Sequence, residues 1–210
     1  MINVTYAITV CNELTEITTL IDFLKDKIGE EDEILIQYDS DSTTDAVKSY
    51  LDIISQIHAS KIKAIGFPLN KDFASYKNNL KNHAKGIFIF QIDADETPTE
   101  YMVENIHQLL EYNKEVDLFF VPRINTVTGL TSEHIKKWGW KVDEKEWINF
   151  PDYQTRLYRR TSEIEWQGKV HERIAGYNTL SVLPQDEQFC LYHHKQIERQ
   201  EKQNDYYDTI

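Results

Sequence analysis

The chain has 210 residues, of which 40% are hydrophobic and 28% charged, a balance typical of a globular domain and not of a disordered chain. Its formal net charge is −12, which excludes the overall basic surface that usually accompanies nucleic-acid binding, so we expect no nucleic-acid partner. No apolar run approaches the length of a membrane span, and the N-terminus lacks the pattern of a signal peptide. These features predict a cytoplasmic protein.

The first half of the chain alternates apolar, strand-like runs with segments of helical periodicity. The expected strands are 4–10, 33–38, 61–67, 86–92 and 116–121, and the expected helices between them are 13–28, 44–58, 73–84 and one that begins near 97. For the last of these helices, Thr97 and Glu100 form a predicted capping box. Because parallel neighbours need crossover helices, repeated β-α units predict a mainly parallel sheet that helices cover on both faces.

The pattern changes after Pro122. Residues 123–153 are rich in aromatic side chains and lack a clean period, so we interpret them as an inserted loop region. Shorter strands are expected at 154–159, 163–166, 169–174 and 189–193, with a polar helix at 196–207. No repeat, low-complexity tract or linker divides the chain. We therefore expect one α/β domain over 1–210, with a Rossmann-like, mixed but mainly parallel sheet flanked by helices.

Two acidic motifs stand where strands are expected to end, which is where open α/β sheets bind ligands. One contains Asp39 and Asp41, and the other contains Asp93 and Asp95. Because side chains alternate along a strand, Asp93 and Asp95 would face the same way, and paired carboxylates suit Mg²⁺ or Mn²⁺. The alternative is a solvated acidic turn that caps the next helix. No glycine-rich phosphate loop is present, so a nucleotide would depend on a metal and on side chains.

Several motifs occur together in a fixed order. They are Val10-Cys11-Asn12-Glu13, Asp39-Ser40-Asp41-Ser42-Thr43-Thr44-Asp45, Asp72-Phe73-Ala74-Ser75-Tyr76-Lys77-Asn78, Asp93-Ala94-Asp95-Glu96, Pro151 to Arg159, Trp166-Gln167-Gly168-Lys169-Val170-His171-Glu172 and Tyr192-His193-His194. Together they resemble the family 2 glycosyltransferases, over nearly the whole chain. The resemblance implies the glycosyltransferase A-type fold, with a nucleotide-sugar-binding half at 1–122 and an acceptor and catalytic half at 123–210.

The resemblance also implies a donor site. Glu13 and Asp39 would line the pocket for the base and ribose, and Lys77 would approach the base or the diphosphate. The Asp93-Ala94 pair would contact the nucleotide-sugar. Asp95 would bind the metal, Mn²⁺ or Mg²⁺, which stabilises the charge of a departing nucleoside diphosphate. His193 resembles a further ligand of that metal, and His194 is its rival.

The resemblance further implies an acceptor site. Glu172 is the candidate catalytic base, because a hydroxyl is a poor nucleophile until a carboxylate takes its proton. Asp152 and His171 are the alternatives to it. His171, Arg156 and Trp166 are acceptor-site candidates, and Trp138 and Trp140 are further aromatic candidates. Core packing remains an alternative role for the tryptophans.

The predicted function is therefore metal-dependent transfer of a sugar from a UDP- or GDP-type nucleotide-sugar to a hydroxyl acceptor. The same resemblance implies inversion at the anomeric carbon. The acceptor class stays open between a glycan, a lipid-linked sugar, a protein, a small molecule and a modified nucleobase. Nucleotidyl transfer is a second hypothesis, although that chemistry usually requires a glycine-rich, basic loop after the first strand to hold a triphosphate. A non-catalytic module that binds nucleotide-sugars is a third.

Overall fold

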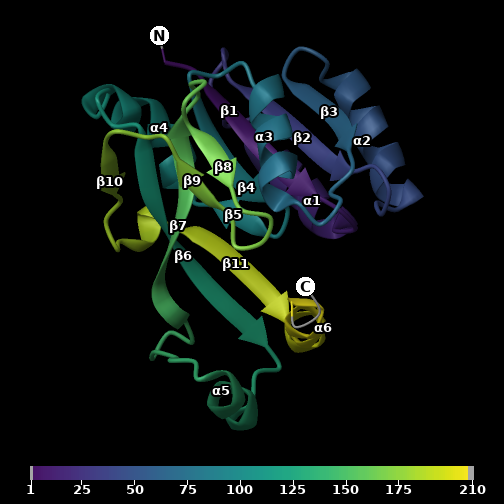
Figure 1. Ribbon diagram of the computed structural model, residues 1–210, viewed down its shortest axis with the longest axis vertical. Coiled ribbons are helices and arrows are strands. Elements are labelled where there is room, and N and C mark those ends of the chain that lie inside the picture. Colours follow the sequence, from purple (N-terminus) through teal and green to yellow (C-terminus); the bar gives the residue numbers. More distant parts are fainter. Residues whose placement is uncertain (1, 208–210) are drawn as a thin grey trace.

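The computed structural model describes residues 2–207, with 203–207 described by their backbone alone, and it contains one large mixed sheet with flanking helices (Figure 1). The strands are β1 (Val4–Val10), β2 (Glu33–Asp39), β3 (Ile62–Phe67), β4 (Phe88–Asp93), β5 (Glu96–Pro98), β6 (Leu118–Thr128), β7 (Ile148–Arg159), β8 (Glu165–Gln167), β9 (Arg173–Ala175), β10 (Leu180–Val182) and β11 (Leu191–Gln196). The helices are α1 (Leu14–Leu24), α2 (Asp45–Ile57), α3 (Phe73–His83), α4 (Glu100–Tyr112), α5 (Ser132–Trp138) and α6 (Ile197–Tyr207), with a 3₁₀ turn at Glu187–Phe189.

The strand order of the large sheet is β3-β2-β1-β4-β7-β6-β11-β5, with β10 paired to β6. Strands β3, β2, β1 and β4 are parallel neighbours, and β11 and β10 also run parallel to β6. The exceptions are β7, which is antiparallel to both β4 and β6, and β5, which is antiparallel to β11. The predicted α/β class with a mixed, mainly parallel sheet is therefore confirmed.

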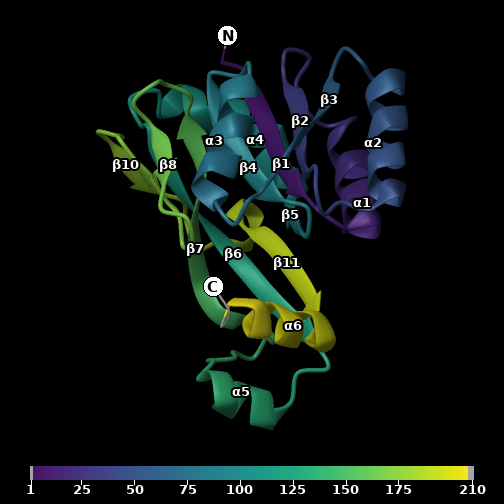
Figure 2. The same ribbon diagram turned by 45° about the vertical axis from the view of Figure 1, so that its right-hand side comes forward.

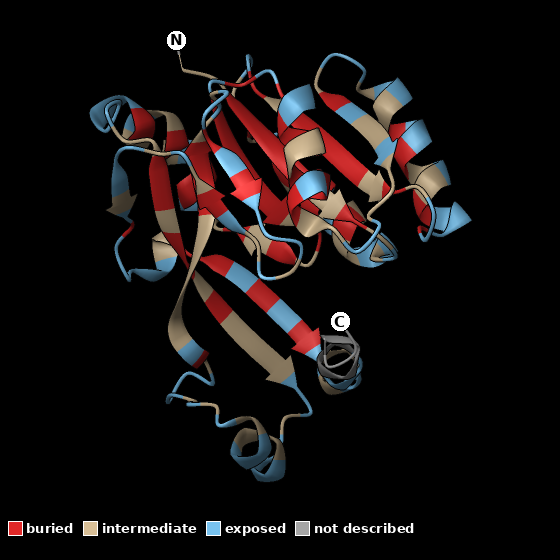
Figure 3. Ribbon diagram, viewed as in Figure 1, coloured by how far each residue is buried: buried red, intermediate tan, exposed pale blue. Residues whose placement is uncertain are grey.

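The core is divided between the two faces of the sheet because side chains alternate along each strand. Tyr6 and Ile8 of β1 belong to the cluster that packs against α1, α2 and α4. Ala7, between them, belongs to the second cluster, which packs against α3 and the β8-β9 hairpin. The central strands β1, β2 and β4 are buried almost throughout (Figure 3). None of the helices in the described part of the chain is long and apolar enough to cross a membrane.

The prediction that residues 123–153 form a loop region is wrong for much of that segment. Strand β6 continues through Pro122 to Thr128, and β7 already begins at Ile148. The extended part of β6 pairs with β11 on one side and β7 on the other, so its strand conformation depends on partners far away in the sequence. Only one of its faces is well buried, which explains why the residues lack a continuous apolar run. Helix α5 lies beyond the end of this extension (Figure 2).

The predicted cap at Thr97 is also wrong, by two residues. Thr97 lies in β5, paired with Tyr192 of β11. The cap of α4 is Thr99, whose hydroxyl oxygen accepts a hydrogen bond from the backbone N–H of Met102 at 3.2 Å. Local sequence allows either threonine to cap the helix, and the pairing of β5 with β11 decides between them.

Candidate functional site

A cavity of about 590 Å³ opens at the carboxyl ends of β1, β2 and β4. Its lining contains eleven of the residues that the sequence singles out: Glu13, Asp39, Lys77, Asp93, Ala94, Asp95, Arg156, Trp166, His171, Glu172 and His193. Parallel strands whose ends meet at one edge bring the acidic motifs together, although those motifs are far apart in the sequence. The cavity is therefore the candidate active site.

The wall formed by the ends of β1 and β2 carries the predicted nucleotide residues. Asp39 is buried, and its Oδ1 accepts hydrogen bonds from the backbone N–H groups of Asp41 and Leu69, both at 3.2 Å. Glu13 Oε2 accepts from the N–H groups of Cys11 and Asn12, at 2.8 and 2.9 Å. These bonds to the main chain hold both carboxylates in place at the edge of the cavity.

Asp93 is fixed by two side chains in the floor of the cavity. Its Oδ1 accepts from the Thr9 hydroxyl at 2.7 Å, and its Oδ2 accepts from Arg156 at 2.5 Å. Burial alone would raise the pKa of Asp93, but the charges of Arg156 and Lys77 and these hydrogen bonds outweigh it, so the pKa lies far below its usual value. Asp93 is therefore ionised at neutral pH.

Asp95 faces His193 across the same edge. Asp95 Oδ2 lies 3.3 Å from His193 Nε2, and the Nδ1 atom of the same ring bonds to the amide oxygen of Asn125 at 2.7 Å. Because an amide oxygen only accepts, Nδ1 carries a proton and Nε2 is the nitrogen turned toward Asp95. Burial acts to raise the pKa of Asp95, yet the pKa is lowered by His193 and Lys195. His194 points elsewhere, to the hydroxyls of Thr126 and Thr128.

Asp95 and His193 fit the implied divalent ion as two adjacent ligands. Among the described residues, no group of three or more His, Cys, Asp or Glu side chains is arranged to hold a metal. Mg²⁺ and Mn²⁺ sites in nucleotide enzymes commonly take few protein ligands and complete their coordination with phosphate oxygens and water. The donor set is therefore suited to an ion that binds together with a diphosphate.

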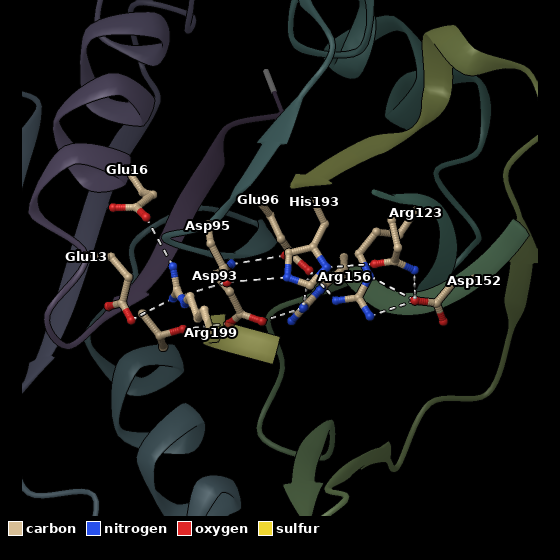
Figure 4. A network of polar contacts seen from close by, with 12 residues as sticks. Glu13, Glu16, Asp93, Asp95, Glu96, Arg123, Asp152, Arg156, His193 and Arg199 are labelled. Carbon is tan, nitrogen blue, oxygen red and sulfur yellow. Dashed lines mark hydrogen bonds and ion pairs between the residues drawn. The ribbon is translucent and has the colours of Figure 1, made fainter. Parts of the chain in front are cut away.

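A chain of buried charges behind the acidic turn was not predicted from the sequence. Glu96 is fully buried and accepts hydrogen bonds from Arg123 at 2.7 Å and from Arg156 at 2.6 Å (Figure 4). Arg156 also binds Asp93, and Arg123 also binds Asp152 at 2.6 Å. Negative and positive side chains alternate from Asp93 to Asp152, and their ion pairs connect the acidic turn to β6 and β7. The contacts of Arg156 favour a role in holding Asp93 over contact with an acceptor.

Replacing Glu96 with glutamine is expected to lower the free energy of unfolding by about 3–5 kcal/mol, because the buried Arg156 and the partly buried Arg123 lose a shared negative partner. Urea unfolding at neutral pH measures the effect. Glu100→Gln is the matched control, since Glu100 is an exposed partner of Lys27 and its replacement is expected to leave the midpoint unchanged. Equal midpoints for the two variants would contradict a stabilising role for the buried charges.

The predicted base Glu172 and the acceptor candidates His171 and Trp166 line the same cavity, from the segment between the start of β8 and β9. Glu172 Oε1 lies 2.5 Å from Lys77 Nζ, and this nitrogen also lies 4.3 Å from the centre of the Trp166 ring. Lys77 thus lies beside the candidate base. Trp166 is buried and donates from Nε1 to the Tyr158 hydroxyl at 3.1 Å, which indicates that much of its surface serves packing.

The alternative residues are placed less favourably. Asp152 accepts from Arg123, Asn125 and Gln154, so its two oxygens are already engaged. Trp138, the last residue of α5, stacks on His134 of the same helix. Trp140 lines a second, smaller cavity of about 220 Å³. The two cavities share the lining residues Arg123, His193 and Lys195.

Comparisons with known proteins bear on the fold and the family of the chain. The family model described as glycosyl transferase family 2 matches residues 5–182. No curated protein matches the chain by sequence. The structure of S. aureus TarS 1-349 in complex with UDP-GlcNAc superposes with a TM-score of 0.62 at 16% identity, covering 93% of this chain and 59% of that one. TarS 1-349 in another crystal structure gives a TM-score of 0.61 at 15% identity, covering 92% and 60%.

At these identities the superposition establishes the fold, which is the glycosyltransferase A-type fold. The chain spans about 60% of the length of the TarS fragment that it matches. The family model matches most of the chain, including the strand ends that carry Asp39, Asp93 and Asp95 and the segment that carries Glu172. The chain therefore belongs to glycosyl transferase family 2.

Proposed function

We propose that the chain transfers a sugar from a UDP- or GDP-type nucleotide-sugar to a hydroxyl acceptor, with Mn²⁺ or Mg²⁺ and with inversion at the anomeric carbon. The observation that carries the proposal is the meeting of Asp39, Asp95, His193 and Glu172 in one cavity of about 590 Å³. A nucleotide pocket, a pair of metal ligands and a carboxylate base then face a common space. The fold shared with TarS in complex with UDP-GlcNAc supports a donor of this class.

In the proposed reaction, Asp39 accepts a hydrogen bond from the base of the donor, and Asp93 contacts the ribose or an ordered water. Asp95 and His193 would hold the divalent ion, which supplies Lewis-acid stabilisation of the departing diphosphate. Glu172 takes the proton of the acceptor hydroxyl. The acceptor oxygen forms its bond to the anomeric carbon as the bond from that carbon to the diphosphate oxygen breaks, and the nucleoside diphosphate leaves.

The placement of Glu172 relative to the proposed metal ligands supports inversion. A single displacement needs one base on the side opposite to the leaving group and no covalent intermediate. Glu172 lies on the wall formed by the segment after β8, whereas Asp95 and His193 lie on the wall formed by the turn after β4 and by β11. The ion pair with Lys77 fixes the direction of the Glu172 carboxylate between these walls.

A thermal-shift panel of UDP- and GDP-sugars, each with and without Mn²⁺, tests the proposal. A donor at 100 times its dissociation constant stabilises the folded state by about 2.7 kcal/mol, which corresponds to a rise in melting temperature of roughly 5–10 °C. We expect such a rise with one donor class and only in the presence of Mn²⁺. Stabilisation by a nucleoside triphosphate, with release of pyrophosphate from that triphosphate when a sugar phosphate is added, would instead establish nucleotidyl transfer.

A further inference from the structure

Helix α6 places an arginine at the mouth of the candidate active site. Arg199 Nη2 donates to Glu13 Oε1 at 2.8 Å and lies 3.3 Å from Asp95 Oδ2, while Nη1 donates to Glu16 Oε1 at 3.1 Å (Figure 4). The helix follows β11 directly and lies between the body of the sheet and α5 (Figure 2). A single guanidinium therefore joins α6 to the end of β1, to α1 and to the acidic turn after β4.

Two of the three partners of Arg199 are residues that the donor site requires. Asp95 is the proposed metal ligand, and Glu13 lies in the proposed base and ribose pocket. The Oδ2 atom of Asp95 that contacts Arg199 is the same atom that faces His193 Nε2. A divalent ion between Asp95 and His193 would therefore compete with the guanidinium for one carboxylate oxygen, and the two positive charges would repel each other.

The contacts of Arg199 can be exchanged at low cost. Its side chain is about 36% exposed, and ion pairs at partly solvated sites contribute little to stability. Arg123 and Arg156, by contrast, are held in the buried pairs with Glu96. A guanidinium also presents a planar fork of donors that matches two phosphate oxygens. Among these three arginines, Arg199 is the one suited to move from a carboxylate to an incoming diphosphate.

We propose that Arg199 is a donor-binding residue that changes partners: it pairs with Asp95 and Glu13 in the ligand-free chain, and it donates to the diphosphate once metal and donor bind. The inference rests on the proposed function and adds a residue and a segment to that site. It makes α6 a part of the donor site that closes over the diphosphate. It also predicts that Arg199 has opposite effects on the two ligands, opposing metal binding and favouring nucleotide binding.

Isothermal titration of the full chain with Mn²⁺ alone, and then with UDP or GDP at saturating Mn²⁺, tests the proposal on Arg199→Ala. We expect the affinity for Mn²⁺ alone to rise by about threefold to tenfold, because a competing cation is gone. We expect the affinity for the nucleoside diphosphate to fall by about tenfold or more, because a charge-assisted contact is lost. Arg199→Lys keeps the charge without the fork, so it should bind Mn²⁺ as the unchanged chain does and bind UDP or GDP with intermediate affinity.

Lys202→Ala is the matched control, since Lys202 is exposed one turn further along the same helix and its loss changes the net charge equally. Both affinities of this variant should stay within about twofold of those of the unchanged chain. If the affinities of Arg199→Ala for Mn²⁺ and for the nucleoside diphosphate both fall, or if neither changes, the inference about Arg199 is wrong while the proposed function still stands. If the unchanged chain binds neither UDP nor GDP in the presence of Mn²⁺, the proposed function fails, and this inference fails with it.

Discussion

Replacing Asp95 with asparagine is expected to lower the turnover of sugar transfer by about 10²–10³-fold, because the departing diphosphate loses most of its charge stabilisation. The carboxylate lies beside His193 at the carboxyl end of β4, and the amide that replaces it is a weak ligand for a hard cation. Initial rates with the donor identified by thermal shift, measured over a series of Mn²⁺ concentrations, give the effect. The concentration of Mn²⁺ at half-maximal rate should rise as well.

Asp41→Asn provides the matched control for this variant. Asp41 belongs to the other Asp-x-Asp motif, after β2, and its side chain is exposed and bonded to Ser40. The same chemical change there is expected to leave turnover within about twofold, because the hydrogen bond from Asp41 to Asp39 comes from the backbone N–H and the exposed side chain takes no part in it. Full activity of Asp95→Asn would remove the metal from the acidic turn, whatever the control shows.

Replacing Glu172 with glutamine is expected to lower kcat by about 10²–10⁴-fold, the range over which a positioned general base contributes. Donor affinity should change less than kcat, because the hydrogen bonds that hold Asp39, Asp93 and Glu13 come from other groups. The dissociation constant for the nucleoside diphosphate, measured beside kcat, separates the two effects.

Two further variants make this test specific. Glu165→Gln, an exposed carboxylate on β8, serves as the control and should keep full kcat. Asp152→Asn tests the rival base. We expect this variant to lose stability, because Arg123 loses a partner at 2.6 Å, and to keep more of its kcat than Glu172→Gln does. If Asp152→Asn loses kcat while Glu172→Gln retains it, the base is Asp152.

The sequence determined the first half of the fold because each signal there is local. Strands β1 to β4 are short apolar runs, and the helices between them repeat apolar residues at helical spacing, so each element is recognisable in one window. The acidic motifs of Asp39 and Asp95 follow strand ends directly. General rules for parallel sheets then place both motifs at one edge. The order of the motifs was enough to indicate the family.

Only the tertiary structure decided the rest of the site. Lys77 and Glu172 are 95 residues apart, and Arg199 and Glu13 are 186 residues apart, so no window of the sequence contains either pair. Glu96 and Arg123 gave no signal, because a charged residue in an acidic turn or an aromatic-rich stretch is usually solvated. Their burial depends on opposite charges that β6 and β7 bring within hydrogen-bonding distance. Local periodicity therefore determined the elements, whereas pairing between distant strands determined which charges lie inside.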